Sequence, residues 1–198
     1  MHAVSAGKPA LVEVYPRTRT TWRRWLANNH KDCSGVWLIY DKASTGQQKL
    51  SYGDAVEEAL CFGWIDSTVR GIDAGRYMQY FAPRKPRSVW SGPNKERVAR
   101  LIDQKQMRPA GFASIEIAKQ NGSWETLDSV EAMVIPEALA AALAEVPVAE
   151  ANFAAFSPSS RKGYLYWINA AKSAETRAKR IAETVALSAV NRKSRHLP

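Results

Sequence analysis

The segment from residue 84 to residue 94 holds the side chains of this sequence that are best suited to bind an anion. An arginine fork can hold a carboxylate or phosphate through two hydrogen bonds, and a tryptophan can stack on a ring. The serine and asparagine of the segment are typical helix caps, and a helix N-terminus also favours negative charge. The candidate anion-binding residues are Arg84, Lys85, Arg87, Trp90, Ser91 and Asn94, with Trp64, Asp66 and Tyr80 in support.

The same segment also has a structural interpretation, which the sequence leaves open. In that interpretation Trp90 belongs to the hydrophobic core, and Ser91 or Asn94 serves only as a helix cap. The cations are then solvated or pair with acids such as Asp66 and Asp73. Pairing of the cations with these acids would favour the structural interpretation over the anion site.

A second set of residues has the types needed for thiol chemistry. Cys61, His30 and Asp66 could in principle activate a thiolate, but their spacing gives this hypothesis no further support. A cysteine between Leu60 and Phe62 is typical of a small buried hydrophobic residue. An enzyme that uses Cys61 or Asp66 therefore stays an alternative, and we assign no catalytic residues.

Motifs for cofactors and metals are missing from the sequence. It contains no Gly-x-Gly-x-x-Gly fingerprint, no Walker A loop and no Gly-x-Ser-x-Gly elbow. Its three histidines and two cysteines are not spaced as metal ligands. We therefore expect no cofactor and no metal site.

The charge of the chain is strongly positive and unevenly distributed. The formal net charge is +9, and two basic segments, 84–108 and 161–195, contain eight and nine Lys/Arg residues with two acids each. Between them, residues 120–160 contain six acids and no Lys or Arg, so this stretch could neutralise part of the basic charge. Nucleic-acid binding through the two basic segments is an alternative function, and it would require exposed aromatic residues beside them.

Periodicity and capping residues predict the elements that position these side chains. Thr18 or Thr20 should begin a helix with Trp22, Trp25 and Leu26 inward and with Arg23 and Arg24 outward. Glycine-bearing turns and β-branched residues predict a strand at 35–42 and a hairpin of strands 64–72 and 76–82. Further helices are expected at 51–63, after 91, at 109–122, after Pro136 and, as the longest, from Ser157 to about Val185.

The order of these elements predicts an α+β protein. A small antiparallel sheet, made of a strand plus a hairpin, should be covered by helices and followed by a helical C-terminal module. The composition becomes acidic and alanine-rich near residues 125–135, which suggests a boundary there. We therefore expect an α+β domain at 14–128 and a helical module at 132–192.

Several stretches of the chain resemble the YdeI/OmpD-associated family, a bacterial family also described as bacteriocin-protection proteins. The first are WRRWLANNH (22–30), GVWL (35–38), SYGDAVEEALCFGWIDS (51–67) and YFAPRKPRSVWSGPN (80–94). Further stretches are MRPAG (107–111), AKQNGSW (118–124) and AAKSAETRAKRI (170–181). The resemblance implies a role in protection from bacteriocins or cationic peptides and an association with an outer-membrane porin.

Composition and resemblance together suggest a non-enzymatic stress or protection protein. Its partner would be a small anionic ligand or an acidic protein segment bound at residues 84–94. No apolar run approaches the roughly 20 residues of a membrane span, and the start of the chain lacks a basic stretch followed by an apolar one. With only two cysteines as well, we expect a cytoplasmic protein without membrane insertion.

Overall fold

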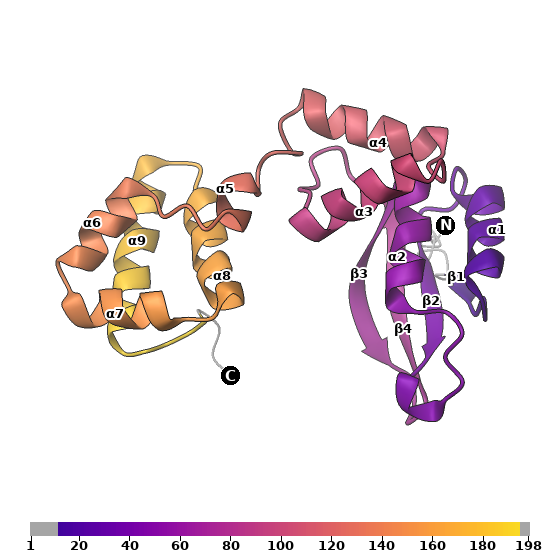
Figure 1. Cartoon of the computed structure of the whole chain (residues 1–198), viewed down its shortest axis with the longest axis horizontal. Coiled ribbons are helices and arrows are strands. Elements are labelled where there is room, and N and C mark those ends of the chain that lie inside the picture. The colour runs from indigo at the N-terminus through magenta and orange to yellow at the C-terminus, as the bar shows by residue number, and fades with distance from the viewer. Residues whose placement is uncertain (1–11, 195–198) are drawn as a thin grey trace, which may run out of the picture. The chain divides into compact units, whose positions relative to one another are not determined.

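The computed structural model describes residues 12–194, which form two compact units that divide between Trp124 and Glu125 (Figure 1). The domain boundary predicted from the sequence lies slightly later, between residues 128 and 132. Within residues 12–194, no helix has the length and the apolar character needed to cross a membrane. Each unit has its own hydrophobic core, so each is described by itself.

The first unit contains a four-stranded sheet in the order β1-β2-β4-β3. Its strands are β1 (Val12–Val14), β2 (Val36–Asp41), β3 (Trp64–Gly71) and β4 (Arg76–Pro83). The hairpin β3–β4 and the pairing of β2 with β4 are antiparallel, as predicted. The short strand β1, which pairs with β2 in parallel, was not predicted, so the sheet is mixed and not wholly antiparallel.

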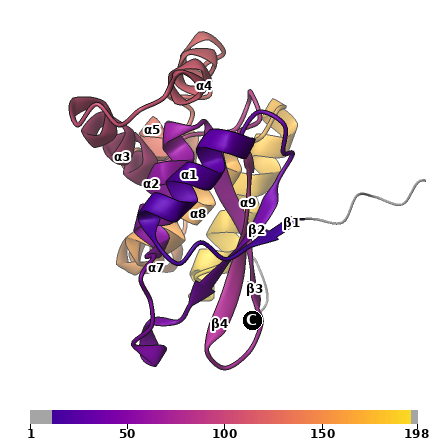
Figure 2. The ribbon, with the colours of Figure 1, turned by 90° about the vertical axis from the view of Figure 1, so that its right-hand side faces the viewer.

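Four helices of the first unit lie on the same side of this sheet (Figure 2). They are α1 (Arg19–Asn29), α2 (Tyr52–Cys61), α3 (Gly92–Asp103) and α4 (Pro109–Gln120), with a 3-10 turn at Ala43–Thr45. Of these, α1 and α2 are next to the sheet, and α3 and α4 pack on α2. Thr18 and Ser51 cap α1 and α2 through side-chain hydrogen bonds, as the sequence predicts. Trp22, Leu38 and Phe81 are fully buried between these helices and the sheet.

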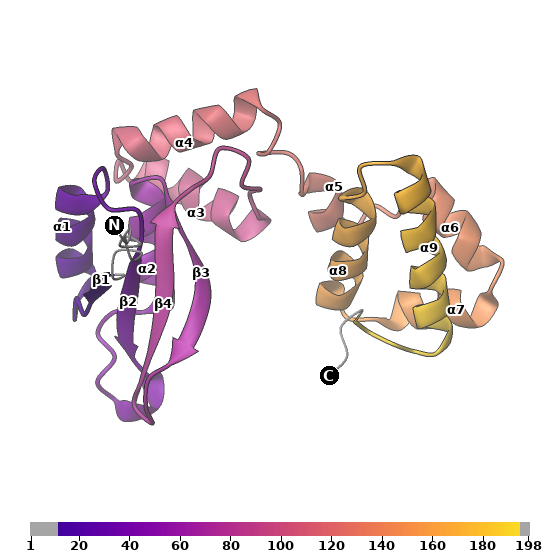
Figure 3. The same cartoon turned by 180° about the vertical axis from the view of Figure 1, so that it is seen from behind.

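The second unit is helical (Figure 3). It contains α5 (Asp128–Glu131), α6 (Glu137–Ala144), α7 (Pro147–Ala155), α8 (Pro158–Asn169) and α9 (Ala174–Ala189). The prediction of one long helix from Ser157 to Val185 is wrong. The chain turns after α8, and the Ser173 side chain accepts a hydrogen bond from the Thr176 backbone N–H to cap a new helix.

The fold class is therefore confirmed as α+β, with a helix-covered sheet followed by a helical module. The elements that matter most for the site are β3, β4 and the segment that follows them. Trp64 pairs with Pro83 at the end of the hairpin, and the Arg84 backbone N–H donates to the Gly63 oxygen at 2.9 Å. This pairing fixes where the chain leaves the sheet and therefore where the 84–94 segment begins.

Candidate functional site

A cavity of about 320 Å³ lies in the first unit, at the end of the β3–β4 hairpin. The end of α1, the end of α2, the start of the 84–94 segment and one side of α4 form its walls. Its walls are mostly apolar and contain four basic residues, and none of the described residues that line it is acidic. The basic residues are His30, Lys31, Arg84 and Lys85, and the larger apolar ones are Phe62, Trp64, Trp90 and Ile117.

Arg84 is held at this cavity by the face of a tryptophan and by two carbonyl groups. Its guanidinium carbon lies 3.7 Å from the centre of the Trp90 ring. Nη1 donates to the backbone oxygens of Ser88 and Val89 at 3.3 and 3.2 Å, which are long for hydrogen bonds. The Trp90 ring is itself buried, 1% exposed, and packs on Trp124 with ring centres 4.9 Å apart.

The other edge of the Arg84 guanidinium makes no hydrogen bond. Its Nε is buried without a partner, and no hydrogen bond or ion pair reaches Nη2 from residues 12–194. Nε and Nη2 form one of the edges through which arginine binds a carboxylate or phosphate with two parallel hydrogen bonds. The guanidinium thus has one edge held by the protein and one edge unused.

The pKa of Arg84 reflects this environment. Burial lowers the pKa to about 10, and the negative charge of Asp66 opposes that effect only in part. Arg84 therefore stays protonated at neutral pH, but its charge is poorly compensated. An anion beside Nη2, the donor of this edge that is not buried, would supply the compensation that a half-buried cation otherwise lacks.

Three other polar groups of the cavity wall already have partners. The Trp64 indole N–H donates to the His30 oxygen at 3.2 Å, and the Ser114 hydroxyl donates to the Gly111 oxygen at 2.8 Å. His30 Nδ1 lies 2.9 Å from the Leu26 oxygen, a contact in which it must be the donor. The wall therefore offers a ligand its cations, its apolar surface and the few polar groups that these bonds leave unused, such as His30 Nε2.

Two glycines set the distance between α4 and the end of α2 beside this cavity. Gly63 has a φ of +74°, and a Cβ there would lie 2.7 Å from the Ala110 oxygen. A Cβ on Gly111 would lie 2.4 Å from the Cys61 oxygen. Side chains at either position would push α4 away, so the glycines are required for this wall.

The structure brings some of the candidate site residues together and separates others. Arg84, Lys85, Trp90 and the supporting Trp64 line the cavity. Arg87 is exposed outside the lining, and Ser91 precedes α3 without a side-chain capping bond. The remaining candidates have other contacts: Asn94 accepts from Arg97, Asp66 accepts from Tyr52 and Gln79, and Tyr80 packs on Trp37.

The acids named for the structural interpretation do not bond to the segment's arginines. Asp66 accepts its hydrogen bonds at 3.0 Å from the Tyr52 hydroxyl and at 2.6 Å from the Gln79 amide. Asp73 forms an ion pair with Arg76 at 2.7 Å. The structural interpretation is correct about Trp90, which is part of the core. It also requires a carboxylate partner for Arg84, and neither Asp66 nor Asp73 is bonded to that side chain.

Cys61 is not placed for thiol catalysis. Its side chain is buried, and burial raises the pKa of the thiol above its ordinary value despite the nearby Arg23. A thiol with a raised pKa is a poor nucleophile at neutral pH. His30 packs on Phe62, and among the described residues no hydrogen bond or ring contact joins His30 to Cys61 or to Asp66.

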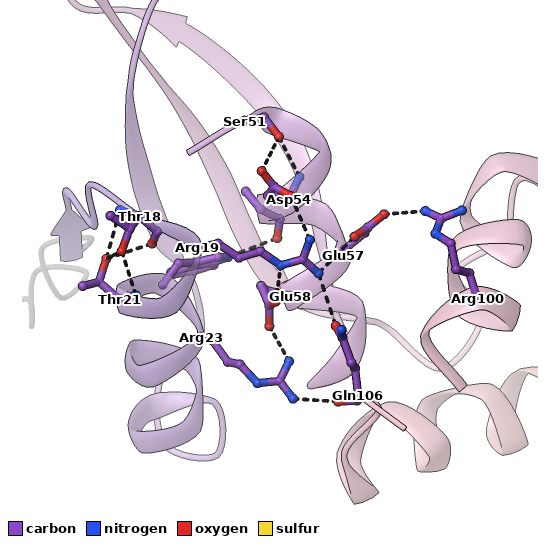
Figure 4. A network of polar contacts seen from close by, with 12 residues as sticks. Thr18, Arg19, Thr21, Arg23, Ser51, Asp54, Glu57, Glu58, Arg100 and Gln106 are labelled. Atoms are coloured by element: carbon purple, nitrogen blue, oxygen red, sulfur yellow. Dashed lines mark hydrogen bonds and ion pairs between the residues drawn. The ribbon is translucent and has the colours of Figure 1, made fainter. Parts of the chain in front are cut away.

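A network of arginines and carboxylates, shown in Figure 4, connects α1 with α2 and was missed by the sequence analysis. Glu58 of α2 is 2% exposed and accepts hydrogen bonds from Arg19 at 2.6 Å and from Arg23 at 2.5 Å. Arg23 was predicted to point outward, but it lies against α2 and also donates to the Gln106 oxygen at 2.7 Å. Arg19 further contacts Asp54 at 2.8 Å.

Cations of the C-terminal basic segment are partly engaged within the second unit. Lys162 pairs with Glu131 at 2.5 Å, and Lys179 pairs with Glu175 at 2.8 Å. Arg180 lies over the Trp167 ring at 5.2 Å and donates to the Trp167 oxygen. Nucleic-acid binding through segments 84–108 and 161–195 stays a prediction, since these contacts neither test it nor favour it.

Comparison with protein families divides the chain at about the same place as the structure. Residues 14–114, just over half of the chain, match a domain of unknown function, DUF8412. Residues 132–191 match the family described as bacteriocin-protection, YdeI or OmpD-associated. Neither a curated protein nor a solved structure matches the chain significantly.

The resemblance to the YdeI/OmpD-associated family is thus confirmed for the C-terminal unit, where the stretch 170–181 lies. The stretches between 22 and 111 lie in the region that matches the other domain model, so the resemblance is narrower than the sequence suggested. The chain therefore belongs to the family of domain DUF8412 and carries a YdeI/OmpD-associated bacteriocin-protection domain in its C-terminal unit.

Proposed function

We propose that this protein is a non-enzymatic, cytoplasmic protection-type protein that binds a small anion in the cavity beside Arg84. Its C-terminal unit matches a bacteriocin-protection family, which is compatible with a protective role. The two cysteines, Cys33 and Cys61, are free thiols, which suits a reducing compartment. The anion would be bound by the first unit, in which the cavity lies.

The observation that carries this proposal is the unused edge of the Arg84 guanidinium. An arginine placed only for packing would be expected to use its remaining donors on carbonyl groups, carboxylates or water. Here the Nε is buried and unpaired, while Nη1 and the ring face are held in place. Because Nε is buried, an anion in the cavity would contact Nη2 first, and a second hydrogen bond at Nε would need a small shift of the guanidinium on the Trp90 ring.

The cavity supports binding more than catalysis. A nucleophile or general base must reach the reacting atom with a free polar group. The Ser114 hydroxyl donates to the Gly111 oxygen, Cys61 does not line the cavity, and the described lining contains no carboxylate. His30 also lines the cavity, but its Nδ1 donates to the Leu26 oxygen, so we propose anion binding by Arg84 and assign no catalytic step.

The proposal can be tested by following the Arg84 Nε–Hε signal in NMR spectra while benzoate or inorganic phosphate is added to the full chain. We expect a saturable shift of this signal, because a new hydrogen bond would form at Nε. Arg84→Lys, which keeps the charge but loses the fork, identifies the signal and should abolish the specific binding. Arg87→Ala removes an exposed cation outside the cavity and should leave the shift unchanged.

The result that would contradict this proposal is a folded protein whose Arg84 signal responds to neither anion. A response of equal size in Arg84→Lys, measured on other cavity residues, would assign the binding to Lys31 or Lys85 instead.

A further inference from the structure

We infer that the cavity takes an amphipathic organic anion: an aromatic body of one or two rings that carries one carboxylate or phosphate group. This inference rests on the proposed function and names the class of ligand that the same site would select. It follows from the size of the cavity, the chemistry of its walls and the single fork that it offers.

The size of the cavity limits the ligand. Since one water molecule takes up about 30 Å³ in the liquid, a volume of about 320 Å³ has room for roughly ten to fifteen non-hydrogen atoms. Ligand pockets commonly range from about 300 to 1,000 Å³, so this one lies at the lower end. A one- or two-ring acid fits, whereas a complete nucleotide or a peptide of several residues does not.

The walls favour an apolar body over a small hydrated ion. Phe62, Trp64 and Trp90 present aromatic surface, and Ile117 of α4 adds aliphatic surface. The Trp64 indole N–H is already bonded to the His30 oxygen, so this ring offers a ligand only apolar surface. An inorganic ion at Arg84 would leave these walls in contact with water, but an aromatic body would cover them.

The charges favour a single anionic group. One guanidinium edge has no partner in the protein, and after a small shift that exposes the buried Nε it can hold one carboxylate or one phosphate through two hydrogen bonds. Lys31 and Lys85 are exposed parts of the lining, so they attract an anion without the fixed geometry of Arg84. Because the described lining includes no acid, a ligand that also carried an ammonium group would find no partner there.

The test compares ligands that differ in one property at a time, with the Arg84 Nε–Hε signal as the readout. We expect 2-naphthoate to bind roughly 30-fold or more tightly than acetate, because it also buries two aromatic rings. The uncharged 2-naphthamide should bind at least about 10-fold more weakly than 2-naphthoate, because it cannot form the charge-assisted fork. Adding 2-naphthyl phosphate identifies which head group the fork prefers, and tight binding of either one supports the inference.

A pair of α4 variants tests the cavity itself. Ile117→Trp replaces an aliphatic side chain of the lining with a larger aromatic one. Because Ile117 is 42% exposed, the variant should fold. It should weaken 2-naphthoate binding by about 10-fold or more through lost space, and leave the acetate response of Arg84 intact. Phe112→Trp is the matched control, since Phe112 is 47% exposed on the same helix and does not line the cavity.

The outcomes separate this inference from the proposed function. If acetate or inorganic phosphate binds as tightly as 2-naphthoate, the ligand class is wrong and anion binding stands. Unchanged 2-naphthoate binding in Ile117→Trp would also overturn the inference, because the aromatic body would then lie elsewhere. If no anion affects Arg84, both the inference and the proposed function fail.

Discussion

The first unit partly buries arginines in two places, and the two environments are opposite in kind. On α1, Arg19 and Arg23 enclose the buried Glu58, and both arginines have carboxylate partners within hydrogen-bonding distance. At the end of the hairpin, Arg84 lies on Trp90 with no carboxylate in contact among the described residues. The first arrangement is complete without a ligand, whereas the second leaves donors unused.

This difference teaches how to separate a structural arginine from a binding one. Burial alone does not distinguish them, because both environments remove a guanidinium from water. What distinguishes them is whether the protein supplies the counter-charge. A second hollow, lined by Arg19, Arg23, Glu58 and Lys105, illustrates the point, because its two arginines already have carboxylate partners and so carry no ligand proposal.

The largest expected effect comes from removing the counter-charge in the complete network. Glu58→Ala would leave two arginines facing each other without their shared carboxylate, whose side chain is only 3% exposed. We expect the free energy of unfolding to fall by about 3–5 kcal/mol. Urea denaturation followed by tryptophan fluorescence measures it, since six of the seven tryptophans lie in the first unit.

The control for Glu58→Ala is Arg100→Gln, which breaks an exposed ion pair with Glu57 at the edge of the same network. The free energy of unfolding of Arg100→Gln should fall by no more than about 1 kcal/mol. Equal losses in the two variants would show that Glu58 is not the centre of the network.

A smaller effect is expected in the acid response of the same network. Burial tends to raise the pKa of Asp54, but hydrogen bonds from Ser51 and Arg19 outweigh it and hold the pKa below the ordinary value of 3.8. A carboxyl with a lowered folded pKa contributes stability above its unfolded pKa and loses it as pH falls through the folded pKa. The free energy of unfolding should therefore decline below about pH 4, and less steeply in Asp54→Asn.

Urea titrations between pH 2 and pH 6 would measure how the free energy of unfolding changes with pH. An identical slope in the wild-type protein and in Asp54→Asn would place the acid sensitivity in other carboxylates.

The smallest expected effect on stability is at Arg84. Arg84→Met keeps apolar contact with Trp90 and removes a poorly compensated charge, so the free energy of unfolding should change by no more than about 1 kcal/mol. The same variant should lose the response to 2-naphthoate. A loss of stability as large as that of Glu58→Ala would mean that Arg84 is structural, and the comparison between the two arginine environments would then fail.

Local signals in the sequence predicted much of the fold and the centre of the site. The capping residues Thr18 and Ser51 begin helices as expected, because their hydrogen bonds depend only on neighbours along the chain. The hairpin of β3 and β4 followed from alternation and a glycine-bearing turn. Arg84 and Trp90 were proposed for the same candidate site because they lie only six residues apart, and the structure places the guanidinium over the ring.

The parts that escaped prediction depend on contacts between distant residues. Arg19 and Glu58 are 39 residues apart, and nothing in either segment alone indicates that they meet. The α4 wall of the cavity depends on Gly63 and Gly111, whose close contact is visible only in three dimensions. The turn between α8 and α9 is different, because Ser173 followed by Thr176 was a capping signal that the continuous apolar stripe concealed.

The close approach at Gly63 and Gly111 has a consequence for how ligand preference can diverge among relatives of this chain. The spacing of the cavity wall is set by backbone atoms, at positions where any added side chain would collide. Residues on the wall, such as Phe62 and Ile117, are free of that constraint. Substitutions at these wall residues can reshape the cavity for a different organic acid, while the backbone spacing between α2 and α4 stays the same.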